Sequence, residues 1–254
     1  MRKLVFLLCI LLWPGLATAG LNEAEAAYKK RNYKVAIKEF QQLAAQGNAS
    51  AQSWLGDAYE YGKGVPQDYT QAMAWYRQAA EQGDVRAQSW LGVAYEYGKG
   101  VPQDYAQAMA WYLKAAEQGD TRAQSWLGGA YENGTGVPQD YSLALEWYRK
   151  AAEQGDFSAQ TSLGMMYFQG QGVLQDLVQA HMWLSLAVAS KFQKVMETFK
   201  DKNKGNIIEL RQRVAAQMTA SQLEEAQRLA REWTAKHGRQ NKTIMELLKR
   251  KQKK

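Results

Sequence analysis

A repeat of 36 residues runs through the middle of this 254-residue chain and constrains its fold more than any other feature. Residues 48–83 and 84–119 differ at only seven positions, residues 120–155 continue the pattern, and residues 156–191 follow it for most of their length. Residues 20–47 form a degenerate copy that precedes them. A fixed period of this length is typical of arrays in which each unit packs only on its neighbours.

Each unit divides into two helices joined by a glycine-rich turn. In the first unit Gly62 ends the first helix, because a glycine can adopt the left-handed conformation found there. Asp68 begins the second helix, and Gln71 three residues later predicts a capping box. The first helices begin at residues that are good N-caps, namely Asn48, Asp84, Asp120 and Asp156.

These helical hairpins predict an all-α protein, an α-solenoid of helix-turn-helix repeats. A single hairpin cannot bury its own apolar face, so stability comes from the contacts between neighbouring units. Residues 192–236 are interpreted as a C-terminal helical cap, in which Thr219 and Gln222 form a capping box before an apolar stripe that ends at Trp233. Tryptophans that recur with the repeat predict a continuous buried spine: Trp75, Trp111, Trp147 and Trp183.

The N-terminus has the pattern of a secretory signal peptide over residues 1–19. Two basic residues precede the apolar run 4–12, and small residues end the segment at Ala19. The alternative is an uncleaved membrane anchor, but the apolar run is short for crossing a bilayer. We therefore expect an exported protein, periplasmic or secreted. Its only cysteine, Cys9, lies in this leader, so the mature chain carries no disulfide.

The positive charge of the chain belongs to its C-terminal end. From Lys236 to Lys254 there are eight Lys or Arg residues against one acidic residue, a difference of seven that equals the net charge of the whole chain. The repeats are therefore close to neutral, which argues against nucleic-acid binding. The basic tail, residues 237–254, is either a solvated terminus or a segment that contacts anionic surfaces.

No pattern in the sequence indicates catalysis. The chain has two histidines, His181 and His237, and lacks the motifs of metalloproteases, serine hydrolases and dinucleotide-binding enzymes. The Gly-x-Gly steps recur with every repeat and are interpreted as turns. We expect that no single repeat is marked by a distinctive set of polar residues, and hence that the protein is not an enzyme and has no cofactor or metal site.

The recurring pattern of alanine, Leu-Gly, tyrosine, glycine, aspartate and tryptophan in residues 51–83, 87–119 and 123–155 resembles the SEL-1-like repeat, a relative of the tetratricopeptide repeat. In the third copy Gly129 replaces a larger residue. The resemblance implies a right-handed superhelix and a protein–protein interaction scaffold or adaptor, which we expect to be monomeric.

By resemblance to tetratricopeptide arrays, the first helices line the concave groove where a partner binds. The residues that the resemblance places in or beside this groove are Trp54, Trp90, Trp126, Asp57, Tyr61, Tyr97, Asn133, Arg86 and Arg122. A row of aromatic faces suits apolar side chains, a cation or sugar rings. An alternative function is therefore a receptor for envelope glycan or peptidoglycan fragments. The three tryptophans equally suit a packing role between neighbouring helices.

Overall fold

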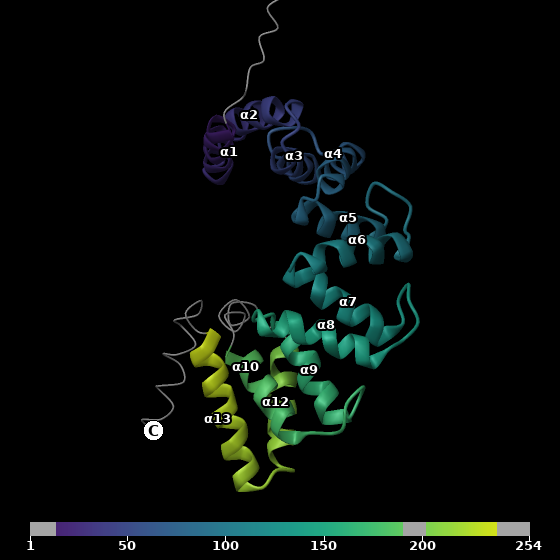
Figure 1. Ribbon diagram of the computed structural model, residues 1–254, viewed down its shortest axis with the longest axis vertical. Helices are drawn as coiled ribbons and strands as arrows, with labels where there is room; N and C mark the ends of the chain where they lie inside the picture. The colour runs from purple at the N-terminus through teal and green to yellow at the C-terminus, as the bar shows by residue number, and fades with distance from the viewer. Residues whose placement is uncertain (1–13, 190–201, 238–254) are drawn as a thin grey trace, which may run out of the picture. The chain divides into compact units, whose positions relative to one another are not determined.

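The computed structural model describes residues 14–189 and 202–237, and this part of the chain is built from α-helices and turns without strands (Figure 1). The prediction of an all-α fold made of helical hairpins is confirmed. The helices in chain order are α1 (Pro14–Lys29), α2 (Tyr33–Ala45), α3 (Ala49–Tyr61), α4 (Tyr69–Glu81), α5 (Val85–Tyr97), α6 (Tyr105–Glu117), α7 (Thr121–Asn133), α8 (Tyr141–Glu153), α9 (Phe157–Gln169), α10 (Leu177–Ala189), α12 (Lys202–Ala215) and α13 (Ala220–His237).

The first of two compact units, Met1–Asp104, contains α1 to α5. Consecutive helices pack on one another, and the side chains of α1, α2 and α3 share one apolar core. Phe40 and Leu55 are fully buried at its centre, and Tyr28 of α1 closes it. The degenerate copy at residues 20–47 thus supplies a hairpin that covers the first complete repeat.

The second unit, Tyr105–Lys254, contains α6 to α10, α12 and α13. Helices α6 to α10 again pack in sequence, and α10 also contacts α12 and α13. The T-shaped contact of Trp183 with Trp233, with ring centroids 6.3 Å apart, joins the last repeat to α13. Helix α13 therefore covers the apolar face that a further repeat would otherwise bury. The handedness of the superhelix remains a prediction.

Capping groups position the first helix of every repeat as the sequence predicts. The side chains of Asn48, Asp84, Asp120 and Asp156 each accept a hydrogen bond from the backbone amide three residues later, at 2.7 to 2.9 Å. The capping box at Thr219 forms in both directions with Gln222.

The predicted capping box at Asp68 is only half right. Its carboxylate accepts from the amides of Thr70 and Gln71. Its own amide, however, donates to the Tyr59 carbonyl at 2.9 Å instead of the Gln71 side chain. That bond links the second helix back to the first, which a capping box would not do.

The aromatic spine of the repeats is made of tyrosine, and the predicted tryptophan spine is wrong for three of its four members. Trp183 is buried, whereas Trp75, Trp111 and Trp147 are half-buried, and lysines cover two of these rings. The neighbouring tyrosines Tyr76, Tyr112 and Tyr148 are at most 5% exposed. Glycines at 56 and 128 allow this, because a Cβ atom there would lie 2.5 Å from the tyrosine ring. A helical period alone does not tell which of two adjacent aromatic residues faces inward.

Buried glutamines, which the sequence analysis missed, tie each first helix to the preceding hairpin. The side-chain amides of Gln52, Gln88, Gln124 and Gln160 donate to carbonyls at the end of the preceding helix, at 3.1 to 3.3 Å. Each of these carbonyls also accepts a hydrogen bond from the amide of the glycine that follows the helix, so the glutamine adds a second one. The register of neighbouring hairpins is thereby fixed by polar contacts as well as by packing.

Three sequence predictions fall partly or wholly outside the described residues. They are the apolar part of the signal peptide, residues 192–201 of the cap and the basic tail after His237. Within residues 14–189 and 202–237, no helix combines the length and the apolar character needed to cross a bilayer. The same residues include no group of three or more His, Cys, Asp or Glu side chains arranged to hold a metal ion.

Candidate functional site

Trp54 is packed into the first unit by aromatic neighbours and by a cation. Its ring stacks on Phe40 with centroids 5.7 Å apart, and Tyr28 lies 5.0 Å away in a tilted contact. Its indole N–H donates to Glu25 at 3.1 Å, and the Arg86 guanidinium lies 4.1 Å from the ring centroid. These contacts favour a packing role for Trp54 over a partner-binding one.

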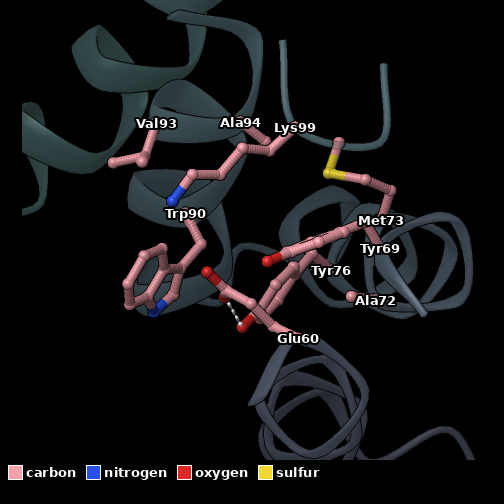
Figure 2. Close-up of a pocket in the computed structure, with 9 residues that line it drawn as sticks. All are labelled: Glu60, Tyr69, Ala72, Met73, Tyr76, Trp90, Val93, Ala94 and Lys99. Carbon is pink, nitrogen blue, oxygen red and sulfur yellow. Dashed lines mark hydrogen bonds between the residues drawn. The ribbon is translucent and has the colours of Figure 1, made fainter. Parts of the chain in front are cut away.

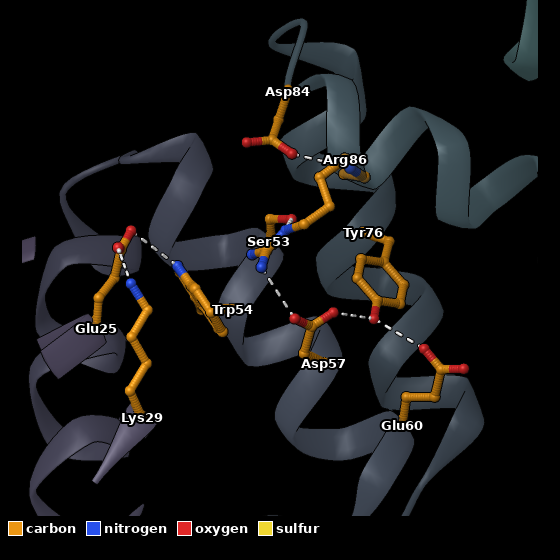
Figure 3. A network of polar contacts seen from close by, with 10 residues as sticks. Glu25, Lys29, Ser53, Trp54, Asp57, Glu60, Tyr76, Asp84 and Arg86 are labelled. Atoms are coloured by element: carbon orange, nitrogen blue, oxygen red, sulfur yellow. Dashed lines mark hydrogen bonds and ion pairs between the residues drawn. The ribbon is translucent and has the colours of Figure 1, made fainter. Parts of the chain in front are cut away.

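Arg86 reaches from α5 across the face of α3 and joins two repeats (Figure 3). Its Nε donates to the Ser53 hydroxyl at 3.0 Å, and its Nη1 forms an ion pair with Asp57, also at 3.0 Å. Both charged side chains are less than one third exposed. We call the contact of α3, α4 and α5 the α3–α5 junction. In this junction the predicted partner-binding residues Trp54, Asp57 and Arg86 bind one another.

The Tyr76 hydroxyl lies between two carboxyl groups in the same junction. It is 2.6 Å from Asp57 and 2.9 Å from Glu60. Burial raises the pKa of both carboxyls. Arg86 and the Tyr76 hydroxyl lower the pKa of Asp57 by a smaller amount. The Tyr76 hydroxyl and Lys99 do the same for Glu60. A hydroxyl has a single proton to donate, so Tyr76 can donate to only one of the two carboxyls at a time.

Trp90 contacts both Tyr76 and Tyr61. The Trp90 ring stacks on Tyr76 at 6.3 Å and meets Tyr61 edge to face at 6.1 Å. Figure 2 shows the cavity that Trp90 lines with Glu60 and Lys99. Its volume is about 10 Å³, which is room for about one water molecule. The side chains around this cavity therefore leave little free space between them.

Trp126, in the second unit, has a different environment. Its ring stacks on Tyr112 with centroids 5.8 Å apart and is 36% exposed. It lines a cavity of about 350 Å³ between α7, α8 and α9, and we call this contact the α7–α9 junction. The residues around the cavity are Arg122, Ser125, Trp126, Gly129, Tyr148, Asp156, Ser158 and Ser162. Cavities that bind small molecules or side chains begin at about this volume.

The remaining predicted residues lie at helix ends. Tyr61 and Tyr97 are 47% and 55% exposed, each with a lysine near its ring. Asn133 donates to the Gly129 carbonyl one turn earlier, at 2.8 Å. Because the predicted row passes through both units, its continuity from Trp54 to Trp126 remains a prediction.

Most residues of the cavity were missed by the sequence analysis, although a signal was present. The α7–α9 junction differs from the others by the small size of three side chains and not by a distinctive polar set. Gly129, Ser158 and Ser162 stand at the positions held by Asp57, Arg86 and Trp90 two repeats earlier. Comparing the repeats position by position, instead of noting their likeness, identifies this junction.

The repeats match the family model for the Sel1 repeat at residues 49–84, 85–120, 121–156 and 157–191. A Sel1 repeat protein from Oxalobacter formigenes is 37% identical, with a TM-score of 0.63, over 66% of this chain and 69% of that one. A protective antigen present in uropathogenic Escherichia coli strains, which displays an SLR fold, is 29% identical with a TM-score of 0.66. That match covers 92% of this chain and 56% of the antigen, so the chain spans little more than half of the antigen's length.

Among curated proteins none shows significant sequence similarity to this chain. The four matched repeats nevertheless cover more than half of its residues, and they coincide with the hairpins from α3 to α10. The chain therefore belongs to the Sel1 repeat family.

Proposed function

We propose that this protein is a non-catalytic scaffold that binds a partner protein on the first helices of its repeats, at the α7–α9 junction above all. Sel1 repeat proteins generally act as protein-interaction scaffolds. The observation that carries the proposal for this chain is the cavity beside the part-exposed ring of Trp126, on one of the helices predicted to line the groove. An exposed aromatic face beside polar groups is typical of interaction sites.

The test is affinity capture with the full chain and two variants, from an extract of the organism that makes the protein. Trp126→Ala removes the exposed indole of α7, and Leu113→Ala removes a side chain of similar exposure, 39%, from the second helix α6. We expect one or more proteins to be captured by the unaltered chain and by Leu113→Ala, and to be lost with Trp126→Ala. Equal capture by both variants, or no captured protein, would contradict the proposal.

We also propose that the protein is exported and that residues 1–19 are removed. In α1, the side chains that pack in the first core include Leu21, Ala24 and Tyr28, which lie after the predicted cleavage point. Cleavage after Ala19 would therefore leave these contacts in place. N-terminal sequencing of the protein from cell fractions tests this: we expect Gly20 as the first residue in the exported fraction, and a chain that begins at Met1 in the cytosol would contradict it.

A further inference from the structure

The two junctions are built from the same residues, 72 positions apart. Ser125, Trp126, Tyr148 and Asp156 of the α7–α9 junction repeat Ser53, Trp54, Tyr76 and Asp84 of the α3–α5 junction. Glycines at 56 and 128 lie equally close to the equivalent tyrosines, since a Cβ atom added at either position would be 2.5 Å from the ring. The contacts made in the α3–α5 junction therefore indicate which chemical group the residues of the α7–α9 junction can bind.

In the α3–α5 junction the guanidinium of Arg86 occupies this space. It lies over the Trp54 ring, donates to the Ser53 hydroxyl and pairs with Asp57 (Figure 3). In the α7–α9 junction the residue at the arginine position is Ser158, whose side chain ends after one hydroxyl group. The indole of Trp126 and the hydroxyl of Ser125 are retained, but the chain supplies no guanidinium from this position.

The loss of three larger side chains accounts for the cavity. Gly129 and Ser162 stand where the first unit has Asp57 and Trp90, and together with Ser158 they line the cavity of about 350 Å³. A side chain from another molecule can enter this space, because the ring of Trp126 is 36% exposed. The cavity is much larger than a single bound water requires.

The charges near the floor of the cavity favour a cation. The Tyr148 hydroxyl donates to Glu132 at 2.7 Å, and Asp156 accepts from the Ser125 hydroxyl at 3.0 Å. The pKa of Tyr148 is raised, first by burial and then by the hydrogen bond to Glu132, and the charges of Glu132 and Asp156 add to the effect. Arg122, whose side chain is exposed, also lines the cavity.

We propose that the α7–α9 junction binds an arginine side chain of the partner protein, with the guanidinium over the Trp126 ring and within reach of Ser125 and Asp156. The partner's arginine takes the place that Arg86 fills within the chain at the α3–α5 junction. The proposal rests on the function proposed above and specifies the chemistry of the partner at that site.

The test uses isothermal titration calorimetry of the full chain with an acetylated and amidated Ala-Arg-Ala peptide. A single side chain in an open site binds weakly, so we expect a Kd of roughly 1 mM. A peptide with citrulline in place of arginine keeps the shape without the charge, and we expect it to bind about fivefold more weakly or worse.

The variant that closes the site combines Gly129→Asp with Ser158→Arg, which restores the ion pair of the α3–α5 junction and leaves the net charge unchanged. We expect it to melt no lower than the unaltered chain and to lose the peptide. The matched control, Ala106→Arg, adds an arginine at an exposed position of α6 and should leave binding unchanged apart from weak charge repulsion. If the double variant keeps the melting temperature of the unaltered chain, its loss of peptide binding is due to filling of the site and not to misfolding.

Equal binding of the arginine and citrulline peptides would overturn the assignment of a cation. Binding of tri-N-acetylglucosamine that is lost in the closed variant, without binding of the arginine peptide, would assign the cavity to a sugar instead. Loss of the partner protein with Trp126→Ala but no arginine preference would leave the scaffold function standing and remove the arginine site. If capture of the partner protein is unchanged by Trp126→Ala and the peptide binding is specific for arginine, the arginine site stands and the scaffold function proposed for this junction is removed.

Discussion

The α3–α5 and α7–α9 junctions start from the same repeat and reach opposite outcomes. In the first, Arg86 crosses from one repeat to the next, covers Trp54 and pairs with Asp57. In the second, glycine and serine stand at the corresponding positions, and Trp126 borders an open cavity. In a repeat array, substitutions at a few positions can turn a contact that stabilises two neighbours into a surface available to another molecule.

The largest expected loss of stability is at Trp54, and its equivalent Trp126 should show a much smaller one. Trp54→Ala removes the stacking on Phe40 and the cation contact of Arg86, and we expect it to lower the free energy of unfolding by about 3 kcal/mol. Trp126→Ala should cost about 1 kcal/mol, because a third of the ring is already in water. Urea unfolding, with hydrogen exchange at α3 and α7 as the local measure, checks both values. Equal losses would mean that Trp126 also has a packing role.

A smaller loss is expected at Asp57, whose position is held by Gly129 in the α7–α9 junction. Asp57→Ala leaves Arg86 without its carboxylate and removes one acceptor of the Tyr76 hydroxyl, so we expect a loss of about 2 kcal/mol. Gly129→Ala should instead stabilise α7 by about 0.5 kcal/mol, because alanine is the better helix former. Its Cβ atom would lie 3.4 Å from the Tyr148 hydroxyl, which is an ordinary contact. The same urea and exchange measurements apply, and a destabilised Gly129→Ala variant would show that the cavity is less open than described.

The smallest effect is a pH dependence confined to the α3–α5 junction. Burial raises the pKa of Asp57 in the folded chain, so the folded state keeps this proton to a higher pH than the unfolded state does. The resulting stability is greatest below the unfolded pKa of about 3.9 and is lost as the pH rises through the folded pKa. We expect exchange protection in α3 to fall across this window.

The control is Asp57→Asn, which cannot titrate at this position and should reduce the pH dependence of α3. Glu60 also has a pKa raised by burial. Adding Glu60→Gln to Asp57→Asn should therefore remove the remaining pH dependence of α3. A pH dependence that is unchanged in the variant carrying both substitutions would show that these carboxyls are not its source.

The repeat period and the capping residues were enough to predict the helices, because both depend on local chemistry. Asp84 caps α5 and Gly62 ends α3 through contacts within a few residues of each. The choice of Tyr76 over Trp75 as the buried ring was not predictable, because it depends on the close approach allowed by Gly56 on another helix. The site was only partly predicted for a similar reason. Trp126 and Arg122 were predicted. Ser158 and Ser162 were not, because they contribute to the cavity by being smaller than the residues at the equivalent positions of earlier repeats.

The most direct test of the account follows the indole N–H signals of Trp54 and Trp126 by two-dimensional NMR while the Ala-Arg-Ala peptide is added. Trp54→Phe and Trp126→Phe variants assign the two signals. We predict a saturable shift of the Trp126 signal and almost none of the Trp54 signal, whose N–H is held by Glu25 and whose ring is already covered by Arg86. A shift of Trp54 equal to that of Trp126, or a Trp126 signal that does not move at peptide concentrations well above ~1 mM, would contradict the account.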